Sequence, residues 1–329
     1  MAEGRAAIIA SVGAGRMGRG IAHAFAYAGH AVRLVDIKPR SPEDLARLEA
    51  EARAEIGASL TVLAGAGVLP AGAIGQILSR ISIHGAAEAG GAIAGADVVF
   101  EGVPETEAAK REALAVIDRH ADPAAVVAST TSTFLSSLLA GMSASPQRFL
   151  NAHWLNPAYL VPLVEVSPHA GTDPDVTRRL VDLLTAIGKV PVVCKASPGY
   201  IVPRIQALAM NEAARLVAEG VASAEDIDKA ILYGFGVRFS VLGLVEFIDW
   251  GGGDILYYAS RYMAQATGED RFNAPPAVEE NMAQGRIGMK TGQGFYDWAG
   301  TDVEAHRKRR IGEFVGLLRH LGQIKPPVL

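Results

Sequence analysis

The sequence has few of the residues that mark secreted, membrane-spanning or nucleic-acid-binding proteins. Cysteine occurs once in 329 residues, which excludes an internal disulfide framework and is typical of a reducing compartment. No apolar run approaches the roughly 18 residues that a spanning helix needs. The formal net charge of −4 provides no excess of positive charge for nucleic acid or acidic membranes. We therefore expect a soluble cytoplasmic protein with no nucleic acid or membrane partner.

The first part of the chain alternates apolar, β-rich runs with helical patterns. The apolar runs are AAIIASV, AVRLVDI, ADVVFEGV, AAVVAST, RFLNAHW, LVEVSP and KVPVVCK. Such alternation predicts an α/β fold with a Rossmann-like, doubly wound and mainly parallel sheet. Residues 41–80 have the pattern of two helices with a Gly/Pro break, and we interpret them as a helical arm inserted into the sheet domain. Strand signals stop after KASPGY, so we expect a sheet domain at 1–196 and an all-α domain at 197–329.

A glycine-rich loop follows the first expected strand and opens a helix. VGAGRMG places Gly13, Gly15 and Gly18 at G-x-G-x-x-G spacing around Met17, which allows a tight turn and close approach of a pyrophosphate to the helix N-terminus. The next strand ends at Asp36, whose carboxylate can accept hydrogen bonds from the adenine ribose hydroxyls. A glycine turn without a ligand is the alternative. The complete pattern predicts binding of NAD, because Asp36 would repel the 2′-phosphate of NADP.

Basic residues near Asp36 weaken the predicted preference for NAD over NADP. Arg33, Lys38 and Arg40 are close to Asp36 in the sequence and could reduce the repulsion of a 2′-phosphate.

The segment AHWLNPAYLVPLVEV, residues 152–166, contains a histidine and a glutamate at the ends of two expected strands. Two strands joined by a Pro-containing turn could bring His153 and Glu165 together. A histidine can remove a hydroxyl proton near neutral pH, and a carboxylate on its other ring nitrogen fixes the tautomer. Most histidines are surface or satisfied core residues, but ligands of such sheets bind at the C-terminal ends of strands, where His153 is expected.

At this point the sequence resembles the 3-hydroxyacyl-CoA dehydrogenase family over nearly its whole length. The resemblance rests on GAGRMGRGIA, FEGVPETEAAKREAL, ASTTST, HWLNP followed by PLVEV, SPGYIVPR and GMKTGQGFYDW, in the family's order. It implies an NAD-dependent enzyme that interconverts a secondary alcohol and a ketone. It also implies that His153 and Glu165 are the catalytic pair.

The resemblance implies roles for four further residues. Ser132 matches the serine that binds the reacting oxygen, and Glu105 and Lys110 match residues beside the nicotinamide ribose and carboxamide. Asn156 matches the Asn-Pro that shapes the substrate site behind His153. Each has a structural alternative: a turn-capping serine, an ordinary helix start and a plain Asn-Pro turn.

Three departures from the family pattern affect the predicted substrate. The first is the loss of two asparagines. Pro203 stands where the family usually has an asparagine that binds substrate, and Thr130 also replaces a common asparagine. The second departure is in the arm. The arm from Ser41 to Arg80 contains no lysine, whereas acyl-CoA members use arm lysines to bind the phosphates of coenzyme A. The arm therefore offers little positive charge to bind the phosphates of coenzyme A.

The third departure, GFGVRFSVLG, resembles the branch of L-gulonate 3-dehydrogenase (lambda-crystallin) and carnitine dehydrogenase. There Arg238 would bind a substrate carboxylate, unless helix C-terminal carbonyls or an acid such as Glu246 satisfy it. We favour a dehydrogenase of small free 3-hydroxy acids. The alternatives are a short-chain 3-hydroxyacyl-CoA dehydrogenase and a catalytically silent, crystallin-like NAD-binding protein. The resemblance implies a homodimer through the apolar helices after Gly199, and no metal site is predicted.

Overall fold

The computed structural model describes residues 6–328, and the chain divides into two compact units, unit 1 (Met1–Ala209) and unit 2 (Met210–Leu329). The strands, all in unit 1, are β1 (Ile8–Val12), β2 (Ala31–Val35), β3 (Ile81–His84), β4 (Val98–Glu101), β5 (Val126–Ser129), β6 (Phe149–Trp154), β7 (Leu163–Pro168) and β8 (Val190–Val193). The α-helices of unit 1 are α1 (Arg16–Tyr27), α2 (Pro42–Gly65), α3 (Ile74–Leu78), α4 (Ala89–Ile93), α5 (Glu107–His120), α6 (Ser136–Ala140) and α7 (Pro174–Ala186). A further helix, α8 (Val202–Ala218), begins in unit 1 and continues into unit 2.

Unit 2 is built of helices and turns. Its helices are the end of α8, α9 (Ala224–Ala230), a π-helix η4 (Ile231–Gly236), α10 (Val237–Phe239), α11 (Leu244–Gly251), α12 (Gly253–Thr267), α13 (Pro276–Ala283) and α14 (Val303–His320). Ser223 caps α9, because its hydroxyl accepts the backbone N–H of Asp226. Pro203 lies in the first turn of α8, where a missing N–H costs no intrahelical bond.

The eight strands form one sheet in the order β3-β2-β1-β4-β5-β6-β7-β8. Every neighbouring pair is parallel except β6 and β7, which are antiparallel. This order confirms the predicted doubly wound fold, with the helical arm inserted between β2 and β3. The sequence patterns missed β3, since ISIH is only four residues long and two of them are polar.

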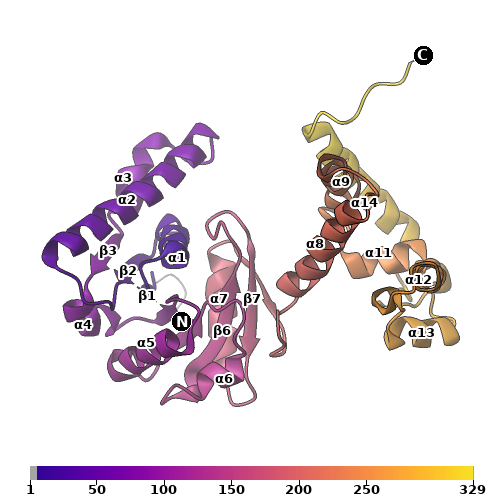
Figure 1. The fold of residues 1–329 in the computed structure, drawn as a ribbon. Coiled ribbons are helices and arrows are strands. Elements are labelled where there is room, and N and C mark those ends of the chain that lie inside the picture. Colours follow the sequence, from indigo (N-terminus) through magenta and orange to yellow (C-terminus); the bar gives the residue numbers. More distant parts are fainter. Residues whose placement is uncertain (1–5, 329) are drawn as a thin grey trace. The chain divides into compact units, whose positions relative to one another are not determined.

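Helices cover both faces of the sheet (Figure 1). On one face α1, α2, α3 and α7 pack against residues such as Ile9, and on the other face α4, α5 and α6 pack against Ala10 and Val12. Alternate residues of β1 thus contribute to the hydrophobic cores on the two faces of the sheet. α2 and α3 lie side by side in the arm (Figure 1), and Leu60 joins the arm to the core of the first face.

Within the described range, no single helix has the length and apolar character needed to cross a membrane, although residues 224–239 and 244–251, bent by 85°, meet that test as a pair.

Candidate active site

The glycine loop joins β1 to α1 and leaves room for a ligand at one position. Gly13 has φ +111°, and a side chain there would place Cβ 2.6 Å from the carbonyl oxygen of Gly102. At Gly18 a Cβ would lie 1.9 Å from the carbonyl oxygen of Gly13, whereas nothing lies within 4 Å of the corresponding position at Gly15. Among the described residues no side chain caps α1, so the N–H groups of its first turn are available to an anion.

A cavity of about 450 Å³ opens beside this loop at the carboxyl ends of β1, β2 and β4. Its lining includes Gly13, Gly15, Asp36, Val103 and Glu112. The volume lies in the range of cofactor sites, and a buried acid at the end of β2 faces the place where an adenine ribose would lie. The described residues therefore fit NAD. Met17 is not among the lining residues, because its side chain packs against the core.

Of the three basic residues near Asp36 in the sequence, Arg40 is its ion-pair partner. Arg33 instead donates to the carbonyl oxygens of Ala92 and Ala94. Asp36 is 5% exposed and also accepts the backbone N–H of Lys38 at 3.3 Å. The charge of the Asp36 carboxylate is therefore partly neutralised by Arg40.

His153 and Glu165 are direct cross-strand partners on β6 and β7. Nδ1 of His153 lies 2.8 Å from Oε2 of Glu165, so the two side chains meet as their positions on two expected strands predicted. Glu165 is fully buried, and its Oε1 accepts the backbone N–H groups of Ile201 at 2.9 Å and Val202 at 2.8 Å. Three donors therefore fix this carboxylate, and the two backbone donors tie it to the start of α8.

The contact determines which ring nitrogen of His153 can act as a base. A carboxylate only accepts hydrogen bonds, so the proton of the neutral imidazole lies on Nδ1 and Nε2 carries the lone pair. Among residues 6–328, no group bonds Nε2, and this atom is not buried. The arrangement provides an accessible basic nitrogen.

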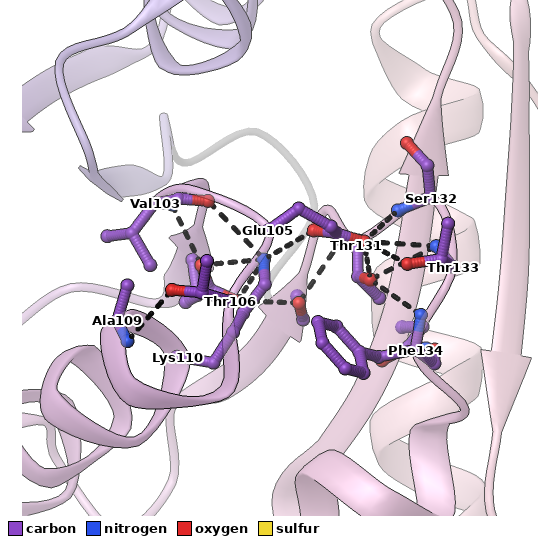
Figure 2. Close-up of polar contacts among 12 residues, drawn as sticks. Val103, Glu105, Thr106, Ala109, Lys110, Thr131, Ser132, Thr133 and Phe134 are labelled. Atoms are coloured by element: carbon purple, nitrogen blue, oxygen red, sulfur yellow. Dashed lines mark hydrogen bonds and ion pairs between the residues drawn. The ribbon is translucent and has the colours of Figure 1, made fainter.

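Figure 2 shows how Glu105 holds the turn after β5 that carries Ser132. Oε1 of Glu105 accepts the hydroxyls of Thr131 and Thr133 and the backbone N–H groups of Ser132 and Thr133, the latter two at 3.0 Å. Burial would raise the pKa of Glu105, but the bond from Thr131 and the charge of Lys110 lower it to about 2. The hydroxyl of Ser132 points away from Glu105 (Figure 2) and remains available.

Lys110 lies beneath this network rather than on the surface. It is 1% exposed, and its ammonium lies 3.1 Å from Glu101 and 3.2 Å from Glu105. Ser129 donates to Glu101 at 2.6 Å. Lys110 therefore contacts the cofactor cavity indirectly, through Glu105 and through the carbonyl oxygen of Val103. Glu101 and Ser129 were not predicted, although a glutamate ending the apolar strand VVFE was a visible signal.

Asn156 and Arg238 stand apart from these contacts. Asn156 is exposed and follows β6 by two residues. Arg238 is exposed in unit 2, where its guanidinium lies 4.9 Å from the ring centroid of Phe247. Glu246, the acid that could have satisfied Arg238, is bound by His306 at 2.8 Å and by Arg310 at 2.9 Å instead.

Comparison with known proteins places the chain among the NAD-dependent dehydrogenases. Residues 8–197 match the model of the NAD-binding domain of 3-hydroxyacyl-CoA dehydrogenase, and residues 199–298 match that of its C-terminal domain. The chain therefore belongs to the 3-hydroxyacyl-CoA dehydrogenase family, as its motifs predicted. α14 follows the second match.

Three similar proteins cover most of the chain. The 5-formyl-3-hydroxy-2-methylpyridine 4-carboxylate 5-dehydrogenase of Mesorhizobium japonicum is 31% identical over 95% of this chain and 97% of its own. A lambda-crystallin homolog of Bos taurus is 35% identical over 77% of each chain. The crystal structure of a 3-hydroxyacyl-CoA dehydrogenase of Archaeoglobus fulgidus superimposes with a TM-score of 0.75 at 31% identity, covering 97% of this chain and 100% of the other.

Proposed function

We propose that this dehydrogenase oxidises the 3-hydroxyl group of a small free hydroxy acid, with His153 as the base. The observation that carries the proposal is the buried carboxylate of Glu165, which holds the proton of His153 on Nδ1 and leaves Nε2 free. Nε2 takes the hydroxyl proton as the carbon–oxygen bond becomes a carbonyl. Bound NAD would supply the acceptor for the hydride that leaves the same carbon. Glu165 then stabilises the imidazolium that forms.

Ser132 binds the reacting oxygen in this mechanism. Its backbone is fixed by Glu105 while its hydroxyl is not engaged, so it can donate to the oxygen as charge develops there. Asn156 lies three residues after His153, in the loop that follows β6. This short separation supports a position of Asn156 beside the substrate.

The charges of the arm favour a free acid over a coenzyme A thioester. Arg47 pairs with Asp44, Arg53 pairs with Glu49, and Glu55 on α2 pairs with Arg19 of α1. The arm therefore presents paired rather than free cations to a polyphosphate. The similarity to a pyridine carboxylate dehydrogenase and to a lambda-crystallin homolog supports the same choice and the gulonate dehydrogenase branch.

Arg238 supplies the charge that a free acid needs. Within residues 6–328 its side chain has no carboxylate or hydrogen-bond partner, and the Phe247 ring supports its guanidinium. A planar guanidinium that a ring orients can bind a carboxylate through two parallel hydrogen bonds. The second candidate, a short-chain 3-hydroxyacyl-CoA dehydrogenase, is favoured by the overall similarity to the Archaeoglobus enzyme.

His153→Asn tests the base. We expect kcat for alcohol oxidation to fall by roughly 10²-fold or more with little change in NADH affinity, because proton transfer is lost and cofactor contacts are not. His84→Asn is the matched control, since His84 pairs with Glu88 at 3.1 Å on the surface of unit 1. Normal turnover by His153→Asn would exclude His153 as the base. A wild-type protein that binds NADH without oxidising any hydroxy acid or thioester would instead be catalytically silent.

Arg238→Met tests the substrate class. With a free acid as substrate, KM should rise by roughly 10²-fold, because an arginine–carboxylate interaction is lost, while NAD binding stays unchanged. Arg261→Met is the matched control, since Arg261 lies 5.3 Å from the ring centroid of Tyr257 in the same unit. The assay compares free 3-hydroxybutyrate, gulonate and carnitine with 3-hydroxybutyryl-CoA. A hundredfold preference for the thioester over every free acid would favour the second candidate.

A further inference from the structure

Tyr200 is a buried aromatic residue that touches the proposed base. Its ring stacks on the imidazole of His153, with centroids 4.9 Å apart and planes 9° from parallel. It is 6% exposed and immediately precedes Ile201, which donates to Glu165. The imidazole is therefore held in its plane by Glu165 at one edge and by Tyr200 on one face.

The hydroxyl of Tyr200 has a defined direction. It donates to the carbonyl oxygen of Thr131 at 2.9 Å, and it has no second proton to give. The amide of Asn151 must therefore be the donor in its 2.9 Å contact with the same hydroxyl. The same amide nitrogen donates to the carbonyl oxygen of Phe134 at 2.9 Å. Thr131 and Phe134 bracket Ser132, so this chain of bonds fixes both ends of the turn that carries Ser132.

The backbone of Tyr200 adopts a conformation that its packing must maintain. Its φ of +47° makes it the one non-glycine residue of the described chain with positive φ. Such a conformation costs free energy and persists where surrounding contacts determine it. The two bonds of the hydroxyl and the stack on His153 are contacts of that kind. A side chain that only filled space would not require this backbone.

We propose that Tyr200 is a positioning residue that holds the His153 ring and the Ser132 turn in one fixed arrangement and stabilises the imidazolium form of His153. The inference rests on the proposed function of His153. Asn151 and His153 are two residues apart on β6 and lie on the same face of the sheet, so one side chain can reach both. The electron-rich face of the ring attracts the cation that forms during oxidation.

The other ionisable groups around His153 do not mask the effect of the Tyr200 ring on the imidazolium. Glu165 bonds Nδ1 of His153, and Cys194 and Glu105 each have an electrostatic influence on Tyr200. Burial raises the pKa of Tyr200 well above its usual range, with smaller contributions from these charges. Burial also raises the pKa of the Cys194 thiol. Tyr200 and Cys194 thus stay neutral in the range where histidine ordinarily titrates.

Two variants separate the ring from the hydroxyl. Tyr200→Leu removes both, so we expect kcat to fall roughly 10-fold to 100-fold through misplacement of the reacting groups. We also expect the acid limb of kcat/KM for alcohol oxidation to move down by about half a pH unit, because the imidazolium loses the ring face. Tyr200→Phe keeps the ring, so the acid limb should stay in place while kcat falls less. Neither variant should change the affinity for NADH.

Tyr159→Leu is the matched control, because Tyr159 stacks on His23 at 4.4 Å in the same unit without touching His153. Its pH profile should equal that of the wild type. If Tyr200→Leu and Tyr200→Phe both retain the wild-type kcat and acid limb while His153→Asn is inactive, the positioning role is excluded and the proposed function stands. If Tyr200→Leu does not fold, wild-type kcat in Tyr200→Phe still excludes a role for the hydroxyl. Full activity of His153→Asn would overturn the proposed function first.

Discussion

At the residue scale, the carboxylate of Glu165 predicts an unusual result for a conservative substitution. Its Oε1 accepts two backbone N–H groups, so in Glu165→Gln the amide oxygen must take that position. The amide NH₂ then faces Nδ1 of His153, which has to become an acceptor. The imidazole proton moves to Nε2, and the nitrogen that should accept the substrate proton is blocked.

We therefore expect Glu165→Gln to lose roughly 10²-fold to 10⁴-fold in kcat for oxidation, as much as Glu165→Ala or more. Its melting temperature should nevertheless exceed that of Glu165→Ala, in which the N–H groups of Ile201 and Val202 lose their acceptor. Steady-state rates and thermal melts of both variants check this. A Gln variant with near-normal turnover would contradict the tautomer argument.

The same scale shows what the sequence could and could not predict. His153 and Glu165 were predictable because their chemistry is visible in the residue types and their spacing fits two paired strands. Tyr200 was not, because a tyrosine in a linker has no pattern, and its role depends on Asn151 and Thr131, which are far from it in the sequence. For Lys110 the resemblance implied a place beside the nicotinamide, and an ordinary surface helix start was the alternative; neither pattern shows that its long side chain reaches inward to Glu101.

At the element scale, α1 and α2 meet through a polar contact that should make stability depend on pH. Ser59 of α2 donates to the carbonyl oxygen of Ile56 at 2.8 Å, so it must accept from Nδ1 of His23 on α1, 2.9 Å away. Burial, with a smaller contribution from Lys189, lowers the pKa of His23 from 6.5 to about 4. The folded chain therefore holds His23 neutral where the unfolded chain would protonate it.

Because the unfolded state binds the extra proton between about pH 6.5 and pH 4, stability should fall as the pH falls through this window. His23→Phe keeps an aromatic ring against Tyr159 and removes the titration. Its melting temperature should therefore fall less than that of the wild type between pH 7 and about pH 4.5, near the folded pKa. His84→Asn, at a histidine whose side chain is 26% exposed, should follow the wild type. Equal losses in His23→Phe and wild type would show that His23 does not carry the effect.

Element boundaries also mark the limit of sequence patterns. The order of strands and helices was predictable from the long alternating segments. Strands and helices each bury one face, and the spacing of apolar residues along that face differs between the two. β3 was missed because four residues with polar Ser82 and His84 do not form an apolar run. It is nevertheless a strand, because β2 supplies a parallel partner along its whole length.

At the scale of the whole molecule, unit 2 buries few of its apolar residues and leaves many exposed. Only five of its apolar residues are buried in the described chain: Ile227, Val237, Val278, Met289 and Trp298. Met210, Leu232, Ile255, Tyr258 and Tyr262 are all more than 60% exposed. Exposed apolar surface on this scale favours a partner, and we propose a two-fold homodimer through unit 2.

Light scattering should report twice the mass of the chain at micromolar concentration, as expected for an interface of about 1,200–2,000 Å² or more. Tyr262→Asp should shift the protein toward the monomer, because a charge would be buried in an apolar contact. Val62→Asp is the control, since Val62 is 69% exposed on the arm of unit 1. A wild-type monomer under these conditions would count against the dimer.

The direct pairing of His153 with Glu165 divides the β6–β7 region into parts with different freedom to evolve. One residue inserted within either strand would turn every following side chain to the opposite face and separate the pair. Residues 155–162 connect the strands outside that register, so insertions and deletions there leave the base intact. Asn156, at the second position of this connection, would move with a change in its length, whereas a change in the length of either strand would separate His153 from Glu165.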